Sequence, residues 1–194
     1  MDKLRRAIEG FVPCNDQERR DRELLLIALD RLDTPLTRDN PFAHFTASSW
    51  IVNPARTHVL MAWHNIYKTW AWTGGHADGD SDLLAVALRE AREETGVACI
   101  RPVTGDIFSV EILPVNAHVK RSQFVSAHLH LNVTYLLEAD DAQPLRPKPD
   151  ENSAVAWLPK DEAAENKEEP FMAAVYRKLN DKIIPLPSAW ATGP

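Results

Sequence analysis

The stretch GGHADGDSDLLAVALREAREETGV, residues 74–97, decides the fold of this chain. It begins with two adjacent glycines and continues through a polar loop, residues 76–81, that carries two aspartates. Apolar residues then recur in steps of three and four, which predicts an α-helix over residues 82–95. Gly96 follows at the position where a left-handed residue commonly ends a helix. With the β-rich run that precedes it, the stretch predicts a strand, a glycine loop and a helix.

The predicted helix has an apolar stripe and, on another face, three carboxylates at positions i, i+3 and i+4: Glu90, Glu93 and Glu94. Like charges at these spacings destabilise a helix by about 0.2–0.5 kcal/mol per pair. The helix dipole also disfavours negative charge in the last turns. A divalent cation would remove the repulsion, and all-oxygen ligands favour hard ions such as Mg²⁺ or Mn²⁺. From the spacing alone, a solvated acidic face is the more common explanation.

The segment from Gly75 to Val97 as a whole resembles the Nudix box, the signature of the MutT-like Nudix hydrolase superfamily. That signature runs Gly, five residues, Glu, seven residues, then Arg-Glu-apolar-x-Glu-Glu-x-Gly-apolar. One position departs from it, because Ser81 stands where the signature has its first Glu. The matching positions are Gly75, Arg89, Glu90, Ala91, Glu93, Glu94, Gly96 and Val97.

The resemblance implies an α/β fold, specifically a Nudix-type α/β/α sandwich with a mixed sheet. It also implies hydrolysis of a phosphoanhydride in a nucleoside diphosphate linked to another moiety, such as a nucleotide sugar or ADP-ribose, with Mg²⁺ or Mn²⁺ as cofactor. Glu90, Glu93 and Glu94 are then the expected metal ligands. The expected catalytic residues are Arg89, Glu90, Glu93 and Glu151, the last as a base or further ligand. An ordinary exposed loop carboxylate is the alternative for Glu151.

A second group of residues is expected to contact the substrate. Gly74 and Gly75 allow the backbone to approach a phosphate or metal closely, although an ordinary tight turn explains them as well. His128 and His130 alternate onto one face of a predicted strand, and with His76 they could meet phosphate or ribose groups. For any single histidine, a hydrogen-bonded packing role on a half-buried strand is the competing explanation.

The rest of the sequence predicts one domain with an extension at each end. A helix over residues 19–33 stops before Pro35, and another helix begins at Pro170. Strands are expected over residues 44–52, 57–63, 68–73, 106–113, 126–139 and 154–159. The predicted organisation is an N-terminal helical extension at 1–40, a Nudix domain at 41–165, and a C-terminal helix and tail at 166–194.

Composition excludes several classes of protein. Asp and Glu number 28 against 22 Lys and Arg, and the net charge of -6 argues against a nucleic-acid partner. The longest apolar run, residues 24–29, is far shorter than the roughly 20 residues of a membrane span. We therefore expect a cytoplasmic protein with a small nucleotide-type diphosphate as its partner and no membrane association. Cys14 and Cys99 form no metal or disulfide motif. The oligomeric state stays open, a homodimer included.

Two other functions remain open at this stage. Ser81 is compatible with a catalytically silent Nudix module that binds a nucleotide metabolite. An isomerase acting on an isoprenoid diphosphate would need a catalytic cysteine, and Cys99 is not obviously placed for that role. Because serine favours helix starts, we also predict that Ser81 caps the helix over residues 82–95.

Overall fold

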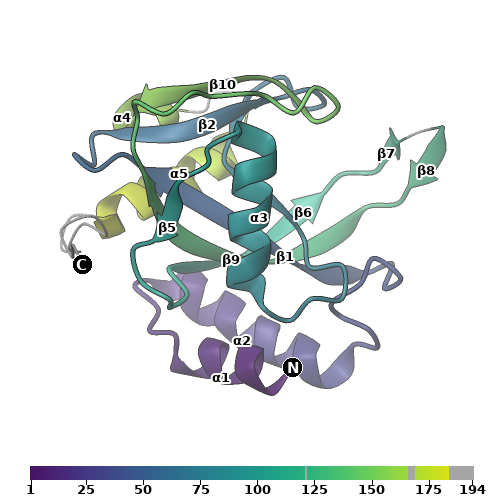
Figure 1. Cartoon of the computed structure of the whole chain (residues 1–194). Helices are drawn as coiled ribbons and strands as arrows, with labels where there is room; N and C mark the ends of the chain where they lie inside the picture. Colours follow the sequence, from purple (N-terminus) through teal and green to yellow (C-terminus); the bar gives the residue numbers. More distant parts are fainter. Residues whose placement is uncertain (121, 166–168, 184–194) are drawn as a thin grey trace. The chain divides into compact units, whose positions relative to one another are not determined.

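The structure is a computed structural model that describes residues 1–120, 122–165 and 169–183 (Figure 1). The chain divides into two compact units. Unit 1 consists of residues 1–48, 74–86 and 106–135, and unit 2 of residues 49–73, 87–105 and 136–194. Four elements contribute residues to both units: β1 (Ala43–Val52), β4 (Thr73–His76), α3 (Leu83–Thr95) and β9 (His128–Ala139). The last residues of the predicted C-terminal tail, 184–194, lie outside the described residues.

The strands form an eight-stranded mixed sheet in the hydrogen-bonded order β10-β2-β1-β9-β5. In addition, β3 pairs with β2, β4 with β1, and β6 with β9. With its helices, this sheet confirms the predicted α/β fold class. The remaining strands of the sheet are β2 (His58–His64), β3 (Trp70–Ala71), β5 (Ile100–Pro102), β6 (Ser109–Val115) and β10 (Asn152–Pro159).

Unit 1 begins with two helices, α1 (Asp2–Gly10) and α2 (Asp16–Arg31), which pack against each other. The sequence pattern predicted only the second of these helices, and its predicted start at residue 19 lies three residues after the observed start at Asp16. The Asn15 side chain accepts the Glu18 backbone N–H at 2.9 Å and so starts α2 earlier. The short α1 buries only Leu4 and Ile8, too few apolar residues for a convincing helical pattern.

Buried and partly buried hydrogen bonds attach α2 to β6 in unit 1. The Gln17 side-chain amide donates to the Val110 carbonyl at 2.9 Å, and Asp21 accepts the Ile112 backbone N–H at 2.9 Å. Glu18 is fully buried and accepts hydrogen bonds from the Cys14 backbone N–H and the Ser109 hydroxyl. A buried carboxylate needs such donors, so these contacts fix the helix on the strand.

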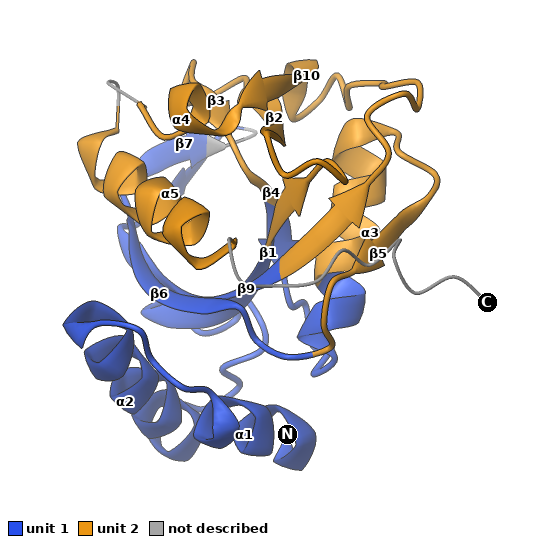
Figure 2. Ribbon diagram, turned by 90° about the vertical axis from the view of Figure 1, so that its left-hand side faces the viewer, with its two compact units in different colours: residues 1–48, 74–86, 106–135 blue, residues 49–73, 87–105, 136–194 orange. Residues whose placement is uncertain are grey.

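Unit 2 is built around a long antiparallel pairing of β10 with β2 (Figure 2). It also contains α4 (Lys160–Ala163), α5 (Pro170–Ile183) and the carboxyl-terminal part of α3. Trp50 stacks on Tyr176 of α5 with ring centroids 5.0 Å apart, and both side chains are buried. Burial raises the pKa of Tyr176, so its hydroxyl stays neutral and accepts the Trp72 backbone N–H at 3.3 Å.

Short elements account for most of what sequence analysis missed. They are β5, α4 and a separate hairpin of β7 (His118–Lys120) and β8 (Gln123–Val125). Elements of three or four residues are too short to show a periodic pattern, whereas the longer strands show one. Among the described residues, no helix is both long enough and apolar enough to cross a membrane.

The start of α3 corrects one prediction, because the capping residue is Asp82 and not Ser81. Asp82 accepts the Ala85 backbone N–H on its side chain at 3.2 Å, and its carbonyl accepts the Val86 N–H at 3.1 Å. Asp80 in turn accepts the Asp82 N–H at 2.9 Å. The helix begins at Leu83, so Ser81 precedes the capping position by one residue.

The capping assignment predicts different costs for neighbouring substitutions. Asp82→Ala should lower the free energy of unfolding by about 0.5–2 kcal/mol, because an N–H of the first turn loses its acceptor. Asp82→Asn keeps a capping oxygen and should retain most of the stability, even though the ion pair with Lys3 is lost. Ser81→Ala should change the free energy by less than about 0.5 kcal/mol. Urea unfolding of the three variants checks this, and a Ser81 cost equal to the Asp82 cost would contradict it.

Candidate active site

Residues 146–152 dock against the carboxyl end of α3 within unit 2. The Arg146 backbone N–H donates to the Thr95 carbonyl at 2.8 Å, and the Asn152 side chain donates to the Glu94 carbonyl at 3.1 Å. Carbonyls in the last turn of a helix have no partner within the helix. The segment satisfies two of them and is thereby held at the turn that carries the predicted metal ligands.

Gly96 makes this approach possible. Its φ of +73° is the left-handed conformation predicted from the sequence. A Cβ at this position would lie 2.8 Å from the Arg146 Cβ and 2.9 Å from the Arg146 backbone nitrogen. Both the backbone conformation and the close contact therefore require glycine.

The docked segment brings Lys148 to the carboxylates. Its Nζ lies 3.2 Å from Glu93 and 3.1 Å from Glu151. Burial lowers the pKa of Lys148, but hydrogen bonds to Glu151 and Glu93 outweigh this effect and raise it overall. Lys148 is consequently a cation held between two acidic side chains.

Sequence analysis did not single out Lys148, and the only available signal was its spacing of three residues from Glu151. Glu151 was predicted to join the box carboxylates, and the structure places Glu93 and Glu151 around the same ammonium group. Its role as base or ligand stays a prediction. The predicted residues Arg89, Glu90, Glu93, Glu94 and Glu151 all lie in unit 2.

Glu90 and Glu94 are less accessible than Glu93. Only 15% of the Glu90 side chain is exposed, and Glu94 is buried. Burial and the neighbouring Glu93 charge raise the pKa of Glu90, and the charges of Arg89 and Lys148 offset part of this. The Arg89 guanidinium lies 3.3 Å from a Glu90 oxygen. Burial and the Glu93 charge therefore disfavour the ionised form of Glu90, and additional positive charge nearby would stabilise it.

The chemistry of this donor set fits a hard divalent cation. Its members are carboxylates, and Lys148 already supplies positive charge between two of them. Glu90, Glu93 and Glu94 are the residues that would hold such an ion.

The predicted substrate-binding residues lie in unit 1. Gly74 has a steric reason of its own, because a Cβ there would lie 2.6 Å from the Ala47 carbonyl oxygen. Gly75 and His76 continue β4, whereas His128 and His130 begin β9. Their roles toward a substrate stay predictions.

The three predicted histidines are brought together with a fourth, His44 of β1. Ring centroids are 5.1 Å apart for His44 and His76, 4.9 Å for His44 and His128, and 5.0 Å for His76 and His130. Burial, followed by the charges of neighbouring histidines, lowers the pKa of His130 to about 3. Burial also lowers the pKa of His44. These two imidazoles are neutral at pH 7 and would not attract a phosphate by charge.

His44 was missed because its run of β-forming residues indicated only a strand.

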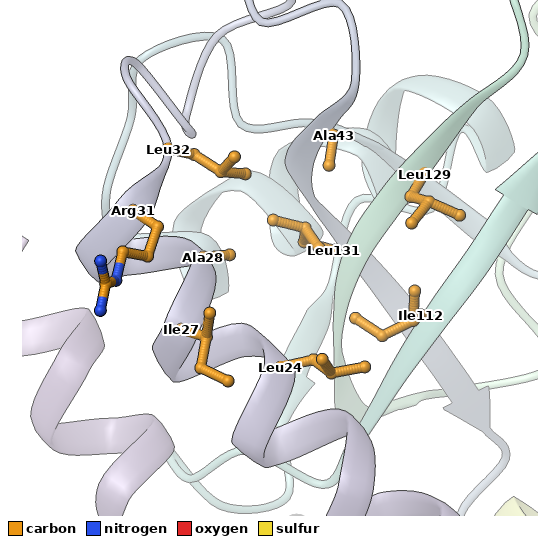
Figure 3. Close-up of a pocket in the computed structure, with 9 residues that line it drawn as sticks. All are labelled: Leu24, Ile27, Ala28, Arg31, Leu32, Ala43, Ile112, Leu129 and Leu131. Atoms are coloured by element: carbon orange, nitrogen blue, oxygen red, sulfur yellow. The ribbon is translucent and has the colours of Figure 1, made fainter.

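A pocket of about 190 Å³ also lies in unit 1 (Figure 3). Its lining is apolar except for Arg31, so it offers no acid–base groups for hydrolysis. The pocket is lined by Leu24, Ile27, Ala28, Arg31, Leu32, Ala43, Ile112, Leu129 and Leu131.

The raised pKa of Glu90 gives a pH-dependent prediction. A carboxyl whose folded-state pKa is raised contributes stability below its ordinary value of about 4.5 and loses that contribution as the pH rises through the folded-state value. Without metal, Glu90→Gln should therefore raise the free energy of unfolding at pH 7 by about 0.5 kcal/mol. The gain should vanish near pH 3. Chemical unfolding at both pH values tests this, and a loss of stability at pH 7 would contradict it.

Gly96 provides a second test. Gly96→Ala should cost at least about 1–2 kcal/mol, because a left-handed alanine is strained and its Cβ meets Arg146. Gly105→Ala is the matched control in the same unit, because nothing lies within 4 Å of the added Cβ. It should change stability by less than about 0.5 kcal/mol. Thermal and urea unfolding compare the two variants, and equal costs would refute the requirement for glycine at position 96.

Comparisons with known proteins identify the family and the fold of the chain. The family model of the NUDIX domain matches residues 43–179. A crystal structure of a C. elegans Ap4A hydrolase binary complex aligns with a TM-score of 0.53 at 17% identity, covering 71% of this chain and 95% of that one. A MutT protein from Methanosarcina mazei Go1 aligns with a TM-score of 0.55 at 14% identity, covering 73% and 95%.

At these identities the two solved structures establish the fold alone. No curated protein matches the chain. The family model, however, spans most of the sequence and includes the whole box helix with its carboxylates. On that basis, the chain belongs to the NUDIX hydrolase family.

Proposed function

We propose that the protein is a metal-dependent hydrolase that cleaves a phosphoanhydride in a nucleoside diphosphate linked to another moiety, such as a nucleotide sugar or ADP-ribose. The observation that carries this proposal is the position of Glu93 and Glu151 around one cationic atom, Lys148 Nζ, beside the partly buried Glu90. Such a cluster has an excess of negative charge that suits a divalent cation and a polyphosphate together.

Glu90, Glu93 and Glu94 would hold Mg²⁺ or Mn²⁺, as their place in the box implies. The bound ion would supply positive charge against the phosphoryl oxygens and make water easier to deprotonate. Arg89, 3.3 Å from Glu90, would orient that carboxylate. Half-exposed Glu151 would take the proton from the attacking water, with Lys148 holding its side chain in place.

The predicted substrate-binding residues of unit 1 would contact the nucleotide-type substrate. His76, His128 and His130 would offer ring nitrogens to ribose or phosphate groups, and Gly74 and Gly75 would offer backbone groups. The lowered pKa of His130 favours contacts by neutral hydrogen bonding over ion pairing. The net charge of -6 supports a small-molecule substrate over a nucleic acid.

The test is a substrate panel measured with Mg²⁺ and with Mn²⁺, scored by phosphate released after phosphatase coupling. The panel should contain nucleotide sugars, ADP-ribose, Ap4A and nucleoside triphosphates. Wild type should hydrolyse at least one compound only when metal is present. Ser81→Glu should raise apparent metal affinity modestly. Activity that appears only in Ser81→Glu would mean that the natural protein is a silent binding module.

Substitutions in the carboxylate cluster should separate metal ligands from a base. Glu93→Gln and Glu94→Gln should abolish metal-dependent turnover, whereas Glu151→Gln should lower kcat by roughly 10²-fold or more and alter the pH–rate profile. Exposed Glu162 of α4 offers a control, and Glu162→Gln should keep wild-type rates. Near wild-type turnover in Glu93→Gln would contradict the assignment of Glu93 as a metal ligand. An unchanged pH–rate profile in Glu151→Gln would show that Glu151 is an ordinary surface residue without a catalytic role.

A further inference from the structure

The histidine cluster in unit 1 has the composition and spacing of a metal site. His44, His76 and His130 each offer one ring nitrogen, and these nitrogens all lie within 4.8 Å of one another. In a tetrahedral zinc site with bonds of about 2.0–2.1 Å, neighbouring ligand nitrogens are about 3.3 Å apart. Rotation of the side chains would close this difference.

A hydrogen bond to the backbone determines which ring nitrogen of His44 carries the proton. Its Nδ1 lies 3.3 Å from the Asn40 carbonyl, which can only accept, so Nδ1 carries the proton and Nε2 carries a lone pair. His128 is arranged in the same way, with its Nδ1 2.9 Å from the Ser126 carbonyl. A carbonyl on the second ring nitrogen is the usual support of a metal-ligating histidine.

Two buried nitrogens of the cluster lack a hydrogen-bond partner among the described residues. They are Nε2 of His44 and Nε2 of His130. A buried polar atom without a partner is costly, and three neighbouring neutral imidazoles cannot all satisfy one another. A cation that accepts several lone pairs at once would satisfy them together.

The hydrogen bond from Nδ1 of His44 to the Asn40 carbonyl leaves a lone pair on Nε2, which favours a cation over an anion as the ligand of the cluster. A metal ion binds neutral imidazole through a lone pair on a ring nitrogen, whereas an anion is attracted by charge only to imidazolium. Burial and mutual proximity lower the pKa of both His44 and His130, which keeps them neutral at pH 7. Arg38 and Asp78, the other charged groups acting on His44, form a two-point ion pair at 2.8 and 2.9 Å and largely compensate each other.

We propose that His44, His76 and His130 form a second metal site, specific for a borderline transition-metal ion such as Zn²⁺, with His128 as the nearest additional ligand or hydrogen-bonding neighbour. Nitrogen ligands select such ions, whereas Mg²⁺ prefers the all-oxygen carboxylate cluster of unit 2. The site joins residues of β1, β4 and β9 within unit 1. It does not depend on the proposed hydrolysis, although an ion bound there would occupy ring nitrogens of His76 and His130 that the proposed function assigns to substrate contacts.

Cobalt substitution tests the proposal, because Co²⁺ absorbs strongly in the visible range only in sites of low coordination number. Titration of chelator-treated wild type with Co²⁺ should give one such site per chain, and Zn²⁺ should displace the ion. His44→Gln and His130→Gln should weaken binding by more than the roughly 10–100-fold cost of losing an outer-shell partner. His58→Gln and Glu93→Gln should bind as wild type does, since His58 and Glu93 both lie in unit 2.

A second measurement uses the wild-type protein, so that it does not depend on whether the histidine variants fold. Zn²⁺ should shift the imidazole C–H resonances of His44, His76 and His130 by NMR and leave those of His58 unchanged. It should also raise the Tm of wild type and of His58→Gln. Unshifted cluster resonances, or cluster variants that bind Co²⁺ as tightly as wild type, would overturn the proposal.

Discussion

The attachment of residues 146–152 to the carboxyl end of α3 is the constraint on which the candidate active site depends. Two helix carbonyls receive hydrogen bonds from Arg146 and Asn152, and Gly96 leaves room for the approach. This contact places Lys148 and Glu151 beside Glu93. A feature of local helix termination thus positions residues that are 55 and 58 positions away from Glu93 in the sequence.

The same contact explains how acidic side chains can be crowded at a helix end. Glu90, Glu93 and Glu94 repel one another and the helix dipole. Lys148 compensates Glu93, and Arg89 compensates part of the charge on Glu90. The compensation is incomplete, because the pKa of Glu90 remains raised. Such residual strain is expected where a protein keeps ligands ready for a cation at the expense of stability.

Much of this arrangement could be predicted from the sequence. The box stretch predicted α3, its carboxylates and the left-handed Gly96, and long runs of β-forming residues predicted β1 and β9 close to their observed bounds. Ser81 was assigned as the cap because a serine precedes the apolar pattern, but the neighbouring Asp82 holds the capping geometry. Where several polar residues adjoin a helix start, composition alone does not choose among them.

Other features depend on contacts between distant segments. Lys148 shows its role only through Glu93, and His44 only through its neighbours on β4 and β9. A sequence pattern records the strand that carries each residue but not which strands become neighbours. The sequence therefore indicated candidate residues for both groups, whereas the partners Lys148 and His44 are recognised only from the fold.

The most direct test of the account is Mn²⁺ affinity, measured by electron paramagnetic resonance in the absence of substrate, for wild type and Lys148→Met. The substitution removes a cation that competes for Glu93 and Glu151, while methionine keeps much of the side-chain volume. If residues 146–152 place Lys148 within the metal site, Lys148→Met will bind Mn²⁺ more tightly than wild type. Unchanged or weaker binding would contradict the central claim that the docked segment and the box carboxylates form one site.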